Sequence, residues 1–176
     1  KLQESGSKII IKGNSITINP RKLNAVNIKT APFPGFPTDL QAPFTALMTI
    51  ANGESKITET IFENRMNHIN LLKKMGANIK LDKNVAYIKG VKTIKGMNLV
   101  ASDLRSSAAL IIAGIIAKGS SKIYGLEHLD RGYENFESKL KMLGIKITRA
   151  SNKRSFSKKE YNISQDSEEI QKCKAA

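Results

Sequence analysis

Hydrophobic residues recur with two different periods along the chain, and together these periods predict an α/β fold. Short runs such as KITETI at 56–61 alternate apolar and polar residues, which is typical of strands with one solvated face. The segments from Leu40 to Ala51 and from Asp103 to Ala117 carry apolar residues at helical spacing. The second segment is apolar on most of its surface, so we expect buried helices with sheets outside them.

The expected strands are short and separated by turn residues. They lie at 8–12, 15–18, 25–30, 56–61, 77–81, 85–90, 97–100, 121–125 and 145–148. Each expected helix is preceded by a residue that can cap its N-terminus and is followed by a glycine. The capping candidates are Thr38 or Asp39, Asn64, Ser102 or Asp103, and Asp130.

One order of motifs occurs twice: loop, Asp, helix, strand, loop, Arg, helix, Gly and strand. The matching pairs are DLQ at 39–41 with DLR at 103–105, Arg65 with Arg131, and KKMG at 73–76 with KMLG at 141–144. Such an internal repeat predicts two similar βα units. We therefore expect residues 1–150 to form part of one pseudo-symmetric domain, with copies at about 25–100 and 101–150.

Residues 151–176 have a different composition from the repeat. They are rich in Ser and Lys and contain few large aliphatic side chains. A segment of this kind buries too little apolar surface to offset the entropy lost on ordering. We expect a polar tail that is disordered or loosely docked.

The formal net charge of +14 favours an anionic partner, such as a phosphate-bearing metabolite, nucleic acid or acidic lipid. Charge alone does not choose among these, and genomic base composition can also produce lysines scattered among Ile and Asn. A non-catalytic basic module that binds nucleic acid or other polyanions stays open as an alternative. No aromatic-interleaved basic stripe supports it, and no apolar run is long enough to span a membrane.

The single cysteine, Cys173, excludes a disulfide within the chain and argues against a cysteine-based zinc site. The two histidines, His68 and His128, have no partner at metal-ligand spacing and are interpreted as ordinary residues. We expect no metal and no cofactor. A chain without disulfides also suits the cytoplasm.

Both copies place an Asp at a helix N-terminus and an Arg before the next helix. Free N–H groups at helix N-termini and planar guanidinium groups both bind anions. A single site built from these residues would therefore hold both a proton acceptor and several anion ligands; its members are Asp39, Arg65, Asp103, Arg105 and Arg131. For each residue alone the ordinary alternatives remain, a helix cap for Asp and a solvated position for Arg.

Four segments resemble the UDP-N-acetylglucosamine enolpyruvyl transferase family. They are AVNIKTAPFPGFPTDLQAPF, ITETIFENRMNHINLLKKMGANI, ASDLRSSAALIIAG and HLDRGYENFESKLKMLGIKI, within residues 25–149. FPTDLQA and TETIFENR are the specific motifs, and they separate the chain from the related shikimate-pathway transferase. The resemblance implies an inside-out α/β barrel of repeated units, of which this chain would be the C-terminal part.

The resemblance also implies an activity. The family transfers the enolpyruvyl group of phosphoenolpyruvate to the 3-hydroxyl of UDP-N-acetylglucosamine, the first committed step of peptidoglycan synthesis. By position, Asp39 matches the proposed base for that hydroxyl, and Asp103 matches a second active-site acid. Ile61 matches a residue that binds the sugar nucleotide through its backbone. The arginines that match ligands of phosphoenolpyruvate or of the anionic substrate or product are Arg65, Arg105 and Arg131.

Part of the family's active site has no counterpart in this sequence. The family's other domain carries a mobile loop with a Cys or Asp that participates in turnover, and Cys173 does not match it. The first residue is Lys1 rather than Met. We therefore expect an enzyme part that is inactive without an N-terminal domain as its partner; a gene relic without a role is the other interpretation.

Overall fold

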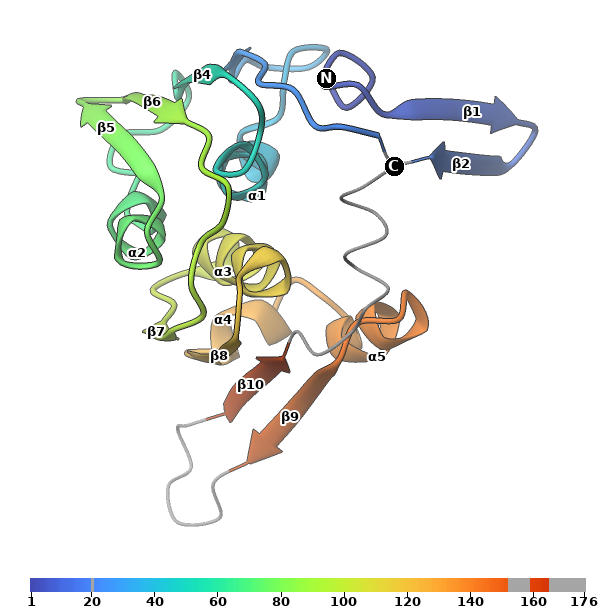
Figure 1. The fold of residues 1–176 in the computed structure, drawn as a ribbon, viewed down its shortest axis with the longest axis vertical. Coiled ribbons are helices and arrows are strands. Elements are labelled where there is room, and N and C mark those ends of the chain that lie inside the picture. Colours follow the sequence, from blue (N-terminus) through green and yellow to red (C-terminus); the bar gives the residue numbers. More distant parts are fainter. Residues whose placement is uncertain (20, 152–158, 165–176) are drawn as a thin grey trace.

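A computed structural model of the chain describes residues 1–19, 21–151 and 159–164. Two four-stranded sheets lie on opposite sides of a pair of packed helices (Figure 1). Helix α1 packs against α3, while α1 also contacts the first sheet and α3 contacts the second. The expected arrangement of helices inside and sheets outside is therefore confirmed.

The first unit forms a sheet in the order β3-β4-β6-β5, with β3 parallel to β4 and the remaining neighbours antiparallel. Its elements are β3 (Ile28–Lys29), the 3-10 helix η1 (Thr38–Leu40), α1 (Gln41–Met48), β4 (Glu54–Thr58), α2 (His68–Lys74), β5 (Asn78–Asp82) and β6 (Val85–Lys89). A separate hairpin of β1 (Lys8–Lys12) and β2 (Ser15–Asn19) precedes this unit.

The second unit repeats the same topology, in the order β7-β8-β10-β9 with β7 parallel to β8. Its elements are β7 (Asn98–Val100), α3 (Leu104–Ile116), β8 (Ser120–Tyr124), α4 (Glu127–Asp130), α5 (Phe136–Met142), β9 (Ile147–Ser151) and β10 (Lys159–Ser164). Two consecutive units thus share one strand order, as a repeat requires.

Helix α3 is the central element of the core. Its Asp103 cap accepts hydrogen bonds from the N–H groups of Arg105 and Ser106, and the Ser106 hydroxyl in turn accepts from the Asp103 N–H. This capping box begins the helix. Leu110 and Ile111 are completely buried, and each such side chain contributes about 1.5–3 kcal/mol of transfer free energy.

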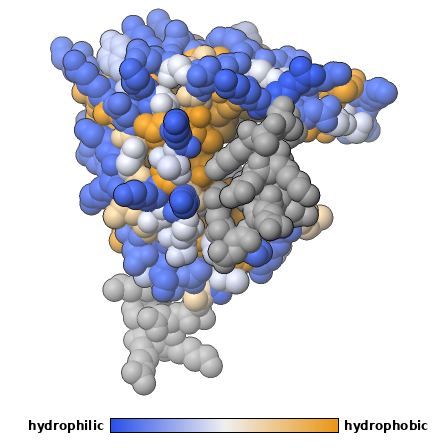
Figure 2. All heavy atoms as spheres, in the orientation of Figure 1, coloured by the Kyte–Doolittle hydropathy of each residue, from blue (hydrophilic) through white to orange (hydrophobic). Residues whose placement is uncertain are grey.

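On the visible face of the molecule, hydrophilic residues predominate and a hydrophobic area lies at the level of the helices (Figure 2).

Residues 159–164, within the segment expected to be disordered or loosely docked, form a strand. Strand β10 pairs with both β8 and β9, and it buries the side chains of Tyr161 and Ile163. These two residues alternate with polar ones, so the strand has one apolar face even though its surroundings are polar. The remainder of the expected tail, residues 152–158 and 165–176, lies outside the described residues.

Three of the expected helix caps are wrong, and only Asp103 caps as expected. Asp39 lies within η1 and makes no capping hydrogen bond. Asn64 has a positive φ of 57° and is separated from the start of α2 by a loop. Asp130 ends the short helix α4, while α5 begins after Asn135, which is also left-handed. Asn residues in the left-handed conformation are typical of helix ends and turns, whereas an N-cap residue is usually extended.

Among the described residues, no helix combines the length and the hydropathy needed to cross a bilayer.

Candidate functional site

Asp39 and Arg105 join the two repeat units at the centre of the predicted site. The Asp39 Oδ1 atom lies 2.6 Å from Arg105 Nε and 2.5 Å from its Nη2. Asp39 belongs to η1 before α1, and Arg105 belongs to the first turn of α3, so the packing of α1 on α3 brings them together. The Asp39 side chain is 68% exposed, and its Oδ2 atom has no hydrogen-bond partner in the described part of the chain.

Arg65 lies on the other side of the same carboxylate, with Nη1 3.8 Å from Asp39 Oδ1. Its Nη1 donates to the Thr38 hydroxyl at 2.9 Å, and its guanidinium stacks on the Phe62 ring, 3.7 Å from the centroid. Burial lowers the pKa of Arg65, and the positive charge of Arg105 lowers it further. The charges of Asp39, Arg65 and Arg105 sum to +1, and this net positive charge favours an anionic ligand.

Asp103 serves as the cap of α3 and lies close to this group. Burial would raise the pKa of Asp103, but hydrogen bonds from the Ser106 N–H, the Ser102 and Ser106 hydroxyls and the Arg105 N–H outweigh it and lower the pKa. Its carboxylate is therefore ionised at neutral pH, and both oxygens already accept hydrogen bonds. The structure thus gives Asp103 a direct role in holding the backbone of Arg105.

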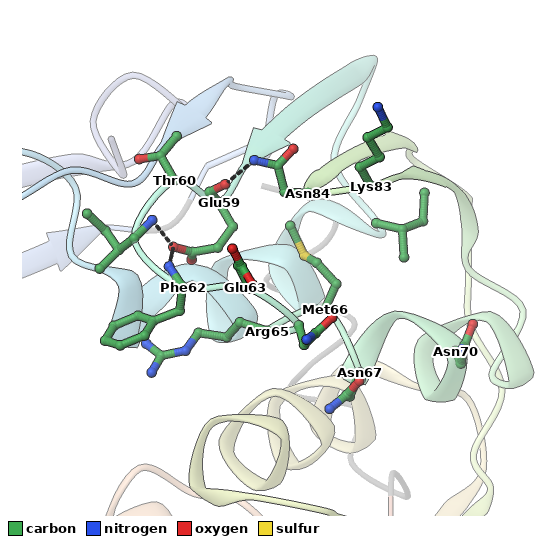
Figure 3. A pocket seen from close by; sticks show the side chains of 13 residues that line it. Glu59, Thr60, Phe62, Glu63, Arg65, Met66, Asn67, Asn70, Lys83 and Asn84 are labelled. Atoms are coloured by element: carbon green, nitrogen blue, oxygen red, sulfur yellow. Dashed lines mark hydrogen bonds between the residues drawn. The ribbon is translucent and has the colours of Figure 1, made fainter.

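Glu59 is a buried carboxylate that the sequence analysis missed. It follows β4, is 1 % exposed, and accepts hydrogen bonds from the hydroxyls of Thr30 and Thr38. It also accepts from the backbone N–H groups of Ile61 and Phe62 (Figure 3). Burial would raise the pKa of Glu59, but these four hydrogen bonds lower it overall. A signal was present in KITETI, because alternation places Glu59 on the buried face of Ile57.

Of the two backbone polar groups of Ile61, only the carbonyl is available to a ligand. Its N–H donates to Glu59 Oε1 at 2.8 Å, and its side chain is partly exposed. With the N–H occupied, the carbonyl oxygen of Ile61 is the backbone group left to contact a ligand. A ligand that binds there must supply a hydrogen-bond donor.

Arg131 does not belong to the ion-paired group that Asp39, Arg65 and Arg105 form. It is exposed, and its side chain forms no ion pair or hydrogen bond within the described residues, although its backbone N–H donates to the Leu129 carbonyl at the end of α4. The turn that carries it is nevertheless close to α3, because a Cβ on Gly132 would lie 2.8 Å from a methyl carbon of Leu104. Asp130, on its other side, is held by Arg149 of β9 at 2.5 Å.

A pocket of about 760 Å³, lined by polar and apolar side chains, lies beside the loop that follows β4 (Figure 3). The loop 59–67 forms one wall, and Lys83 and Asn84 of the β5–β6 turn form another. Ile61 and Arg65 line this pocket, whereas the other four predicted site residues do not. Arg65 therefore borders both this pocket and the Asp39 carboxylate.

His68, at the start of α2, is 1 % exposed, and its Nε2 atom has no hydrogen-bond partner within the described residues. Burial lowers the pKa of His68 to about 4, although the negative charge of Asp103 acts in the opposite direction. His128 lies in α4 and is half-buried. No group of three or more His, Cys, Asp or Glu side chains among the described residues could hold a metal ion.

We expect His68 to make the chain less stable in mild acid. The unfolded imidazole binds a proton near pH 6.5, while the folded one binds it only near pH 4, so protons favour the unfolded state between these values. The free energy of unfolding should fall by about 2 kcal/mol from pH 7.5 to pH 5. Urea unfolding of His68→Gln should show a flatter pH dependence, and His128→Gln should retain the wild-type one. Equal slopes in wild type and His68→Gln would contradict this account.

Comparison with known proteins identifies the family. The family model described as EPSP synthase (3-phosphoshikimate 1-carboxyvinyltransferase) matches residues 1–140. This chain belongs to the EPSP synthase family. Curated relatives named UDP-N-acetylglucosamine 1-carboxyvinyltransferase confirm the resemblance seen in the sequence. One from Prochlorococcus marinus (strain MIT 9312) is 76% identical over 176 residues. One from Synechocystis sp. is 50% identical over 150 residues, or 85% of this chain.

The chain spans 39% of the length of the MIT 9312 relative and 34% of the Synechocystis one. The match to the MIT 9312 relative covers the whole of this chain, including residues 151–176, which lie outside the segments that carry the resemblance.

Solved structures agree on the fold. The enolpyruvyl transferase NikO from Streptomyces tendae superposes with a TM-score of 0.74, covering 93% of this chain and 35% of that one, at 23% identity. EPSP synthase from Acinetobacter baumannii superposes with a TM-score of 0.66, covering 92% of this chain and 37% of that one, at 15% identity. The chain therefore has the enolpyruvyl transferase fold, as a partial domain.

Proposed function

We propose that this chain forms one side of the active site of a UDP-N-acetylglucosamine enolpyruvyl transferase. The observation that carries the proposal is the Asp39 carboxylate, held between Arg105 and Arg65 where α1 meets α3. The names of the close relatives support the choice of UDP-N-acetylglucosamine and phosphoenolpyruvate as substrates.

The reaction would join the 3-hydroxyl oxygen of the sugar to the enolpyruvyl carbon and release phosphate. Asp39 would accept the hydroxyl proton at Oδ2, because Oδ1 is engaged by the guanidinium of Arg105. Arg65, Arg105 and Arg131 would bind the phosphate and carboxylate groups, since guanidinium matches both in a bidentate manner. The carbonyl of Ile61 would accept from a donor on the sugar nucleotide, and Asp103 would keep Arg105 in place as well as lying near the reacting carbon.

The proposal assigns the chain to peptidoglycan synthesis in the cytoplasm, where both substrates would be met. It also assigns a partner. Since the chain spans about two fifths of its relatives' length, the opposing wall of the cleft would come from an N-terminal domain with the Cys- or Asp-bearing loop. Without that wall, bound phosphoenolpyruvate stays open to water, and the arginines act in a high dielectric that weakens them.

A chimera tests this proposal. The matching segment of the MIT 9312 relative is replaced by this chain, and phosphate release from phosphoenolpyruvate is measured with and without UDP-N-acetylglucosamine. We expect turnover that requires both substrates, comparable with that of the unaltered relative, and none from the isolated chain.

Two outcomes would contradict it. An inactive but folded chimera would mean that this chain does not form the active-site wall. Turnover by the isolated chain at the rate of the chimera would mean that no partner domain is needed.

A further inference from the structure

The carboxylate of Glu59 connects three segments of the first unit. Thr30 at the end of β3 donates to Oε1 at 2.9 Å, and Thr38 at the start of η1 donates to Oε2 at 2.8 Å. The loop after β4 donates through the N–H groups of Ile61 at 2.8 Å and Phe62 at 3.2 Å. One buried side chain thus fixes the relative positions of the segments that carry Asp39, Ile61 and Arg65.

The ionised state of Glu59 also sets the direction of two further hydrogen bonds. A carboxylate only accepts, so each threonine must spend its single hydroxyl proton on Glu59 and offer a lone pair to its other neighbour. For Thr38 that neighbour is Arg65 Nη1 at 2.9 Å, and for Thr30 it is the Thr60 N–H at 2.8 Å. Glu59, Thr38 and Arg65 therefore form a chain in which every donor and acceptor is determined.

The second repeat unit shows that the fold does not need this carboxylate. Aligning Arg65 with Arg131 places Gly125 at the position of Glu59, directly after β8. The second unit still has the same strand order and the same parallel pair. A buried charge costs several kcal/mol of desolvation, so its presence in only one of two equivalent places calls for a local role.

We infer that Glu59 is a positioning residue for the anion-binding side of the site, acting through Thr38 on Arg65 and through the loop backbone on Ile61. The inference rests on the proposed function above. Glu59 touches no reacting atom itself, because its oxygens are buried and occupied. Its removal should therefore weaken the binding of the anionic substrate more than it slows the chemical step.

The active chimera provides the main test, with Glu59→Gln as the variant. An amide cannot accept from all four donors: with its oxygen kept at Thr30 and the loop N–H groups, its NH₂ group faces the Thr38 hydroxyl, which already accepts from Arg65. We expect KM for phosphoenolpyruvate to rise at least tenfold, with a smaller change in kcat. Glu54→Gln is the matched control, because Glu54 is an exposed Glu at the start of β4, the strand that Glu59 follows, and the kinetics of this variant should be unchanged.

Thr38→Val is a second variant that removes the connection to Arg65 while keeping Glu59 and the loop. Its KM for phosphoenolpyruvate should also rise, and the double variant should show less than the product of the two single effects. This variant decides the matter if Glu59→Gln does not fold. If Glu59 had only a structural role, the variants would have a lower unfolding temperature but an unchanged KM for phosphoenolpyruvate. That result in either variant would overturn the inference.

Failure of the proposed function would be recognised separately, as a chimera that is inactive with wild-type residues. Binding of phosphoenolpyruvate to the full chain, followed by calorimetry, then takes the place of kinetics. Glu59→Gln should weaken that binding at least tenfold, and Arg65→Met should do the same. Unaltered binding in Glu59→Gln, with weakened binding in Arg65→Met, would overturn the inference.

Discussion

Asp39→Asn in the active chimera should lower kcat by about a hundredfold to ten-thousandfold, the range ascribed to a general base. The amide keeps the shape of the side chain but cannot take the proton of the sugar hydroxyl. KM for phosphoenolpyruvate should not rise, because the carboxylate that occupies Arg105 and Arg65 also competes with an anionic ligand for them. Steady-state kinetics with phosphate release as the readout measures both constants.

The split between the two constants is what distinguishes a base from a binding residue. A raised KM with an unchanged kcat would show that Asp39 only contributes to binding. Asp82→Asn is the matched control, since Asp82 is an exposed Asp at the end of β5, in the same unit. It should behave as the unaltered chimera does.

The periodicity of the sequence predicted most of the fold, because long helices and alternating strands are local patterns. Helix α3 begins at its expected cap and ends at Ile116, three residues before Gly119 with its positive φ. The short elements were less accurate: α4 and α5 replace one expected helix. Helices of one or two turns carry too few residues for their period to be distinct, so tertiary packing decides them.

Strand β10 shows how composition can mislead where topology would not. The first unit ends in the β5–β6 hairpin, and a true repeat requires a second hairpin after β9. The polar composition of residues 151–176 concealed the alternation of Tyr161 and Ile163 with polar neighbours. Applying the repeat to its last strand would have predicted β10.

The site was predicted in part, and the missing part is long-range. The repeat placed Asp39 and Asp103 at matching positions, yet they have different environments. Arg105 reaches Asp39 across the contact between α1 and α3, while Gln41, at the matching place in the first unit, is buried. No local pattern encodes such a distance, so the ion pair between units could only be seen in the structure.

Gly90→Ala should destabilise the chain more than any single exposed substitution. Gly90 follows β6 and crosses the turn between α1 and β4, where a Cβ would lie 1.6 Å from the carbonyl oxygen of Ala51. The clash is with backbone, which is fixed by the bonds from the Gly90 N–H to Gly53 and from the Val91 N–H to Thr49. Relieving it requires the first sheet to shift away from α1, at a cost of about 3 kcal/mol or more.

Gly13→Ala provides the comparison that isolates this steric effect. Gly13 lies in the β1–β2 turn with a φ of 54° and no atom within 4 Å of the added Cβ, so only the left-handed backbone is strained. That strain costs about 1–2 kcal/mol. Urea unfolding of the two variants and the wild-type chain should therefore separate them by at least about 1 kcal/mol. If both variants cost the same, the β6 strand does not lie as close to the turn as described, and α1 would not be held against the sheet that positions Glu59 and Asp39.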